Sequence, residues 1–209
     1  MTTAIEKLLE IGGAPLSGEA PSPLAGLGSL LREEHLALLQ HRNGFFAFEG
    51  ALRIFPGAAC ADAYSLSEWN ARELWRGHYG DLIGEEIFFA EDAFGGQFCF
   101  AREAVCSFDA ETGAIGQLAE TLEEWAAMLL EEAAYLTGEP LMQQWQAAQG
   151  PLAPRKRLMP KTPFVCGGSF ALDNLVAIEA AEAMRYRGEL ALQIRDLPDG
   201  AQICFRVVE

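Results

Sequence analysis

The chain has 209 residues, half of them hydrophobic, and is long enough for one large domain or for one domain with an appendage. Its 15 basic and 30 acidic residues give a net charge of −15, which disfavours binding to nucleic acid or to an anionic membrane. No apolar run approaches the roughly 20 residues of a membrane span, and the N-terminus has no secretory-signal pattern, so we expect a cytoplasmic protein.

The first 118 residues predict two helices and then a series of short strands. The first helix covers residues 3–10, and the second begins near Ser29 and ends at Asn43-Gly44, a pair suited to a positive φ. Ser67 is the expected N-cap of a short third helix over 68–75. Strands are expected where aromatic and β-branched residues gather, at 45–56, 86–90, 97–101, 104–109 and 114–118.

The remaining residues predict helices first and a hairpin last. Thr121 and Glu124 form a capping-box pattern before a helix over 122–136, and another helix is expected over 140–149. Farther on we expect a strand at 164–166 and a helix at 179–188. The last element is a hairpin of two strands, 189–197 and 201–208, joined by the turn Pro198-Asp199-Gly200. The predicted fold class is α+β, a mainly antiparallel sheet packed by helices, with a small C-terminal β-hairpin/helix extension.

The charge divides the chain unevenly. Residues 1–150 hold 7 basic and 23 acidic residues, whereas residues 151–209 hold 8 basic and 7 acidic ones. The boundary segment 151–163 is rich in proline and basic residues, which favour extended structure. We therefore predict an acidic domain over 1–150, a linker or strap over 151–163 and a small αβ extension over 164–209 packed on the domain. Arg155-Lys156-Arg157 either folds back on the acidic domain, which we favour, or contacts an anion or nucleic acid.

The stretch 87–118 places acidic residues beside glycines, and two interpretations are possible. An Asp before glycines can accept hydrogen bonds from the following amides of a hairpin turn, which suits Asp92 before Gly95-Gly96 and Asp109 before Gly113. Catalysis needs a second carboxylate or a histidine fixed nearby, and the sequence shows no reason for convergence. We favour turns, and expect no catalytic residue, metal or cofactor, because the histidines and cysteines have no metal-ligand spacing.

Several segments between residues 30 and 135 follow one another in a recognisable order. They are Asn43-Gly44-Phe45, LRIFPG at 52–57, Glu68-Trp69-Asn70, FFAEDAFGGQFCF at 88–100, SFDAETG at 107–113 and EWAAMLL at 124–130. Together they resemble the SUKH superfamily, which includes fungal cell-wall-synthesis regulators and bacterial toxin-immunity proteins. The resemblance implies an α+β fold without catalytic residues, and the C-terminal region is similar to an extension of some bacterial members.

The resemblance and the charge lead to a binding function. We expect a non-enzymatic protein-binding module, an immunity protein that neutralises a basic, nuclease-type toxin by surface complementarity. A regulatory or scaffold protein for a housekeeping partner and a small-ligand-binding domain are the alternatives. The bland interpretation of the acidity is that it keeps the protein soluble.

Two sets of residues follow from these interpretations. The candidate partner-binding residues, chosen for acidity or for an aromatic ring among polar neighbours, are Glu85, Glu86, Glu91, Glu123, Glu131 and Trp145. The candidate turn residues are Asn43, Gly44, Asp92, Gly95, Gly96, Asp109, Gly113 and Gly200. Trp69, Trp75 and Trp125 are expected in the core.

Overall fold

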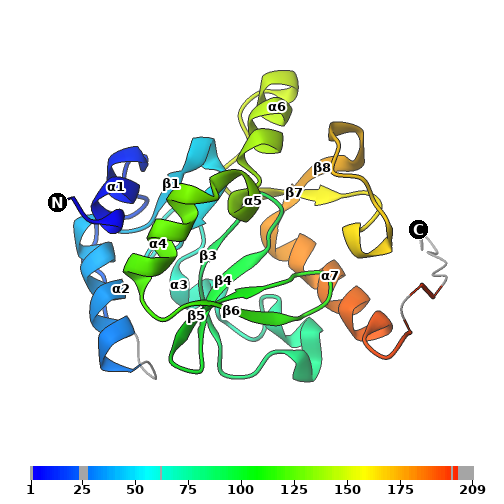
Figure 1. Ribbon diagram of the computed structural model, residues 1–209, viewed down its shortest axis with the longest axis horizontal. Helices are drawn as coiled ribbons and strands as arrows, with labels where there is room; N and C mark the ends of the chain where they lie inside the picture. The colour runs from blue at the N-terminus through cyan, green and yellow to red at the C-terminus, as the bar shows by residue number, and fades with distance from the viewer. Residues whose placement is uncertain (1, 24–27, 62, 199, 202–209) are drawn as a thin grey trace.

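The computed structural model describes residues 2–23, 28–61, 63–198 and 200–201. Its centre is a six-stranded sheet in which each strand pairs antiparallel with its neighbour in sequence, in the order β1-β2-β3-β4-β5-β6 (Figure 1). The strands are β1 Phe45–Ala47, β2 Leu52–Ile54, β3 Ile87–Glu91, β4 Gln97–Ala101, β5 Ala104–Phe108 and β6 Ile115–Ala119. The predicted α+β class with a mainly antiparallel sheet is confirmed.

Helices cover this sheet on two sides of the molecule. The N-terminal helices contact α4 on one side, and α7 lies on the other, beside the small sheet of β7 and β8 (Figure 1). The helices are α1 Ala4–Ile11, α2 Ser29–His41, α3 Leu66–Trp69, α4 Leu122–Glu131, α5 Ala133–Thr137, α6 Glu139–Gln149 and α7 Ala180–Ile194. Four short 3-10 helices are η1 Phe48–Gly50, η2 Arg76–Leu82, η3 Phe164–Cys166 and η4 Leu172–Asn174.

Local sequence accounts for most helix starts. Thr3 caps α1 in a capping box with Glu6, and the Thr121 side chain accepts a hydrogen bond from Glu124 N at the start of α4. The predicted cap at Ser67 is wrong, because Ser65 occupies this position and Glu68 supplies the reciprocal carboxylate of the box. The third helix is accordingly shorter than expected and ends at Trp69.

Aromatic side chains dominate the interior. Trp69, Trp75 and Trp125 are fully buried or nearly so, as predicted, although Trp75 lies beyond the end of α3 and not on the helix expected there. Trp75 contacts the rings of Phe88 on β3 and Phe108 on β5, at centroid distances of 5.0 and 6.4 Å. Burying rings of this size supplies a large part of the hydrophobic stabilisation of the domain.

The C-terminal region differs most from the sequence prediction. Part of the segment expected as a linker is strand β7, Lys156–Pro160, which pairs antiparallel with β8, Leu175–Glu179. The expected strand at 164–166 is 3-10 helix η3, and the expected strand at 189–197 is wrong because α7 continues to Ile194. The other hairpin strand, 201–208, lies almost entirely outside the described residues.

Helix α7 attaches the extension to the first domain. It contacts η2, and Gly188 allows the close approach, since a Cβ at this position would lie 2.8 Å from Tyr79 Cδ2 and 2.9 Å from the His78 carbonyl oxygen. Arg185 Nη1 donates to the Leu74 carbonyl at 3.1 Å. The extension therefore packs directly on the first domain.

Candidate functional site

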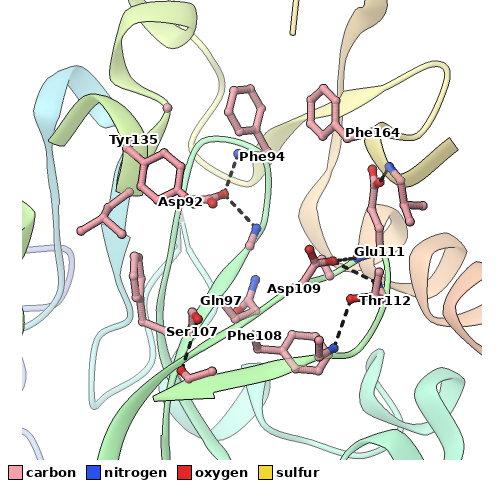
Figure 2. Close-up of a pocket in the computed structure, with 18 of the residues that line it drawn as sticks. Asp92, Phe94, Gln97, Ser107, Phe108, Asp109, Glu111, Thr112, Tyr135 and Phe164 are labelled. Carbon is pink, nitrogen blue, oxygen red and sulfur yellow. Dashed lines mark hydrogen bonds between the residues drawn. The ribbon is translucent and has the colours of Figure 1, made fainter. Parts of the chain in front are cut away.

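A pocket of about 970 Å³ lies where the C-terminal extension meets the sheet (Figure 2). Two hairpin turns of the sheet form much of it, the β3–β4 turn around Asp92 and the β5–β6 turn around Glu111. The α5–α6 junction, the region of η3 and Arg187 of α7 complete the lining. The pocket is thus built from segments that are separate in sequence.

Asp92 shapes the first turn. Its Oδ1 accepts hydrogen bonds from Phe94 N and Gly96 N, both at 2.8 Å, and Gly95 has φ +82° (Figure 2). The predicted turn role of these residues is thus seen in the structure. Burial nevertheless raises the pKa of Asp92 to about 7, so this carboxyl changes charge near neutral pH.

The second turn carries two carboxylates with different surroundings. Asp109 is exposed, and its Oδ1 accepts from Glu111 N at 2.8 Å and Thr112 N at 2.9 Å, while Gly113 has φ +74°. Glu111 is only 7% exposed, and its Oε2 accepts from Val165 N at 2.8 Å. Burial raises the pKa of Glu111 above its ordinary value.

Arg187 of α7 is the cation of the pocket. It is 3% exposed, and its Nε and Nη1 atoms have no hydrogen-bond partner among the residues that the structure describes. Within the described parts of the chain, no carboxylate oxygen lies within 4.0 Å of its guanidinium. Its charge opposes the effect of burial on the pKa values of Asp92 and Glu111 without pairing with either.

Aromatic side chains line one side of this space. The rings of Phe164 and Phe170 stack at a centroid distance of 3.9 Å, and Phe94 meets Phe164 edge-on at 5.5 Å. Phe170 and Tyr135 are 65% and 84% exposed, so aromatic surface remains open to solvent here. A mainly apolar pocket with a few polar groups is the usual form of a small-molecule binding site.

A second charged cluster lies deeper, where Glu91 meets two arginines. Glu91 Oε1 is 2.5 Å from Arg53 Nη2 of β2 and 2.5 Å from Arg157 Nε of β7, and all three side chains are almost fully buried. Arg53 and Arg157 also donate to the Pro154 and Gly50 carbonyls.

The two guanidinium groups of this cluster also lie over aromatic rings. Arg53 lies 5.0 Å from the centroid of Phe55, and Arg157 lies 5.5 Å from that of Phe46. Arg53 Nε and Arg157 Nη2 find no hydrogen-bond partner in the described ranges of the chain. The burial of Arg157 shows that the basic segment folds back on the domain.

One of the predicted partner-binding residues, Glu91, is not on the surface, so that prediction is wrong. Glu91 is 0% exposed and cannot meet a partner, because the side chain points inward to the two arginines. Glu85 and Glu131 are exposed, and Glu86 is half-buried. Glu123 holds α1 against α4 by accepting from Ala4 N and Ile5 N, so its carboxylate is already engaged.

The other predicted residues have local roles. Trp145 is half-buried and packs on the apolar cluster of Ala51, Met142 and Leu158. The Asn43 side chain donates to the Glu19 carbonyl and accepts from Gly57 N, each at 2.7 Å. Gly44 and Gly200 have φ of +68° and +79°, as their turn roles require.

Sequence reasoning missed Glu111 and Arg187 as parts of a site. Glu111 lay inside a turn motif and Arg187 on a predicted helix, and neither position carries a local signal of convergence. The described ranges contain no group of three or more His, Cys, Asp or Glu residues that could hold a metal ion, and no helix long and apolar enough to cross a membrane.

Comparisons with known proteins identify a fold but no family. No family model matches the chain, and no curated protein does. Among solved structures, Atu4351 from Agrobacterium tumefaciens is similar over 88% of each chain, with a TM-score of 0.54 and 14% sequence identity. Similarity at this level concerns the fold alone.

Proposed function

We propose that this chain is a non-enzymatic binding protein that acts in the cytoplasm and neutralises a basic partner protein through its acidic surface. The observation that carries the proposal is where the charges lie. Among the described residues, the buried side chains with a formal charge are Arg53, Arg157, Arg187, Glu91 and Glu111, and their charges sum to +1. The acidic excess of the chain therefore belongs to the remaining residues.

An acidic surface of this kind favours a partner of opposite sign. Complementary charge raises the association rate and selects partners, and its effect falls as salt rises. The resemblance to SUKH immunity proteins suggests the partner class, a toxin with nuclease activity. Such a toxin presents positive charge where nucleic acid binds, so an acidic protein could cover that surface.

A salt-dependent capture experiment tests the proposal. The protein is used as bait in lysate from cells that express its adjacent genes, at low and at high salt. We expect a basic toxin to be captured at low salt and less of it to be captured at high salt. Reversing the charge of exposed residues, as in Glu85→Lys with Glu131→Lys, should weaken capture. The matched control is Asp173→Lys, an exposed acid on the extension.

The proposal would be wrong if the adjacent genes yield no captured toxin. It would also be wrong if capture is insensitive both to salt and to the charge reversals, because the acidic surface would then have no part in binding. Capture of a housekeeping protein instead would favour the regulatory or scaffold alternative.

A further inference from the structure

The pocket at the extension contains a buried donor and a buried acceptor that the protein leaves unused. Within the described part of the chain, neither Nε nor Nη1 of the donor, the Arg187 guanidinium, has a hydrogen-bond partner, and neither does the acceptor, Glu111 Oε1. Both side chains are more than nine-tenths buried and both line the same space. Buried polar groups are nearly always paired, so unpaired atoms on two residues that line one pocket need an explanation.

The neighbouring carboxylates do not supply that explanation. Asp92 uses Oδ1 for two turn amides, and Glu111 uses Oε2 for Val165 N. The region that the structure describes contains no ion pair between Arg187 and any carboxylate. An arginine held at 3% exposure without a carboxylate is available to a bound anionic group, which it can contact through two parallel hydrogen bonds.

We propose that the pocket binds a zwitterionic small molecule of the amino-acid or dipeptide class with an aromatic side chain. Its carboxylate accepts hydrogen bonds from the unpaired nitrogens of Arg187, its ammonium donates to Glu111 Oε1, and its ring packs on the aromatic wall of Phe94, Phe164 and Phe170. The ligand then supplies a hydrogen-bond partner both to the Arg187 guanidinium and to Glu111 Oε1. The proposal does not depend on the acidic-surface function.

The dimensions and charge of the pocket agree with this ligand class. A volume of about 970 Å³ lies near the upper end of small-molecule sites, so a dipeptide fits without filling it. A purely anionic ligand would meet the carboxylates of Asp92 and Glu111, and a purely cationic one would meet Arg187. A molecule with both charges satisfies each group, so it is preferred over either alone.

Isothermal titration calorimetry with three matched probes tests the proposal. The first probe is L-alanyl-L-phenylalanine, which carries both charges. The second is its C-terminal amide, which lacks the carboxylate, and the third is its N-acetyl derivative, which lacks the ammonium. We expect the zwitterion to bind with a dissociation constant on the order of 0.1–1 mM. Each blocked derivative should bind about tenfold or more weakly, because one charge-assisted contact is lost.

Two variants assign the contacts. Arg187→Met should remove the preference for the free carboxylate over the amide, and Glu111→Gln should remove the preference for the free ammonium. Arg185→Met, on the same helix but outside the pocket lining, is the matched control and should leave both preferences unchanged. Thermal unfolding of each variant shows whether it is folded, and Arg187→Met should melt no lower than the wild-type protein.

Specific results would overturn the proposal. They are no heat of binding from any probe up to about 10 mM, equal binding of all three probes, or preferences that persist in Arg187→Met. A large fall in the melting temperature of Arg187→Met would also overturn it, because Arg187 would then have a structural role. None of these results bears on toxin capture.

Discussion

The C-terminal region sends two arginines into the interior of the first domain, and their surroundings differ. Arg157, from strand β7, reaches Glu91 within 2.5 Å and shares it with Arg53. Arg187, from helix α7, is buried to a similar degree but has no carboxylate within 4.0 Å in the described structure. Both sites also contain carboxylates from the β3–β4 region, Glu91 in one and Asp92 in the other.

The difference separates a structural contact from a binding site. In the first cluster the Glu91 carboxylate offsets part of the desolvation cost of the two arginines, although Arg53 Nε and Arg157 Nη2 have no hydrogen-bond partner among the described residues. An open cluster leaves that cost uncompensated until another molecule contributes. Two adjacent residues of one hairpin, Glu91 and Asp92, therefore belong to sites of different kinds.

The largest expected effect comes from opening the closed cluster. Glu91→Ala leaves Arg53 and Arg157 buried without their carboxylate, and we expect the free energy of unfolding to fall by about 3–5 kcal/mol. Chemical denaturation measures it. Glu131→Ala, an exposed acid, is the control and should change the value by no more than about 0.5 kcal/mol. A loss below about 1 kcal/mol in Glu91→Ala would contradict a structural role for the cluster.

The next effect depends on pH and belongs to the open cluster. Because the folded-state pKa of Asp92 is raised from 3.8 to about 7, its contribution to stability is present below about pH 4 and is lost as pH rises to about 7. Asp92→Asn keeps the turn acceptor without the charge. It should be more stable than the wild-type protein at pH 8, by up to about 4 kcal/mol, and equal to it at pH 4.

Denaturation curves at both pH values check this prediction. Asp109→Asn, in the equivalent but exposed turn position, is the matched control. A difference between Asp92→Asn and wild type that stays constant from pH 4 to pH 8 would show that Asp92 does not titrate in this range.

A smaller effect is expected where α7 is held in place. Gly188→Ala would put a Cβ 2.8–2.9 Å from Tyr79 Cδ2 and from backbone atoms of His78, so the helix must shift. We expect a loss of about 1–3 kcal/mol by overpacking, measured by thermal unfolding. Gln193→Ala, exposed on the same helix, should have little effect. Unchanged stability in Gly188→Ala would mean that α7 is not held at this contact.

The last comparison distinguishes the two arginines directly, because one of the two substitutions should have almost no effect on stability. Arg157→Met removes charge-assisted bonds to Glu91 and should lower the free energy of unfolding by about 2–3 kcal/mol. Arg187→Met removes no ion pair seen in the described structure, so the free energy of unfolding should stay within about 0.5 kcal/mol of the wild-type value or rise above it. A rise is expected where a residue serves binding at a cost in stability. Equal losses in both variants would remove the distinction between the clusters.

Most of the first domain could be predicted from its sequence because its contacts are local. Asp92 and Gly95 encode the turn between β3 and β4, Asp109 encodes the turn between β5 and β6, and each strand pairs with the next one along the chain. The C-terminal helix was predicted too short. The residues after Gly188 alternate apolar and polar in a way that suited a strand, and packing on η2 decides for a helix.

The site could not be predicted in the same way. Asp92 and Asp109 were recognised as turn residues, which is correct, but their hydrogen bonds do not reveal that the two turns face Arg187. Arg187 follows Asp92 by 95 positions in sequence, and only the packing of α7 on η2 brings it to the pocket. Glu91 was misassigned to the surface because the partner that buries it, Arg157, lies 66 residues away.

The nearest-neighbour order of the sheet also sets an order of events during synthesis on the ribosome. The six strands can pair as they emerge, since low sequence separation favours early contact. Glu91 and Arg53 meet in that early sheet, whereas Arg157 is made later and arrives as the last member of the cluster. A chain truncated before residue 157 would therefore hold one carboxylate and one arginine where the full chain holds a carboxylate between two. The second arginine is therefore added to the buried cluster only after residue 157 has been made.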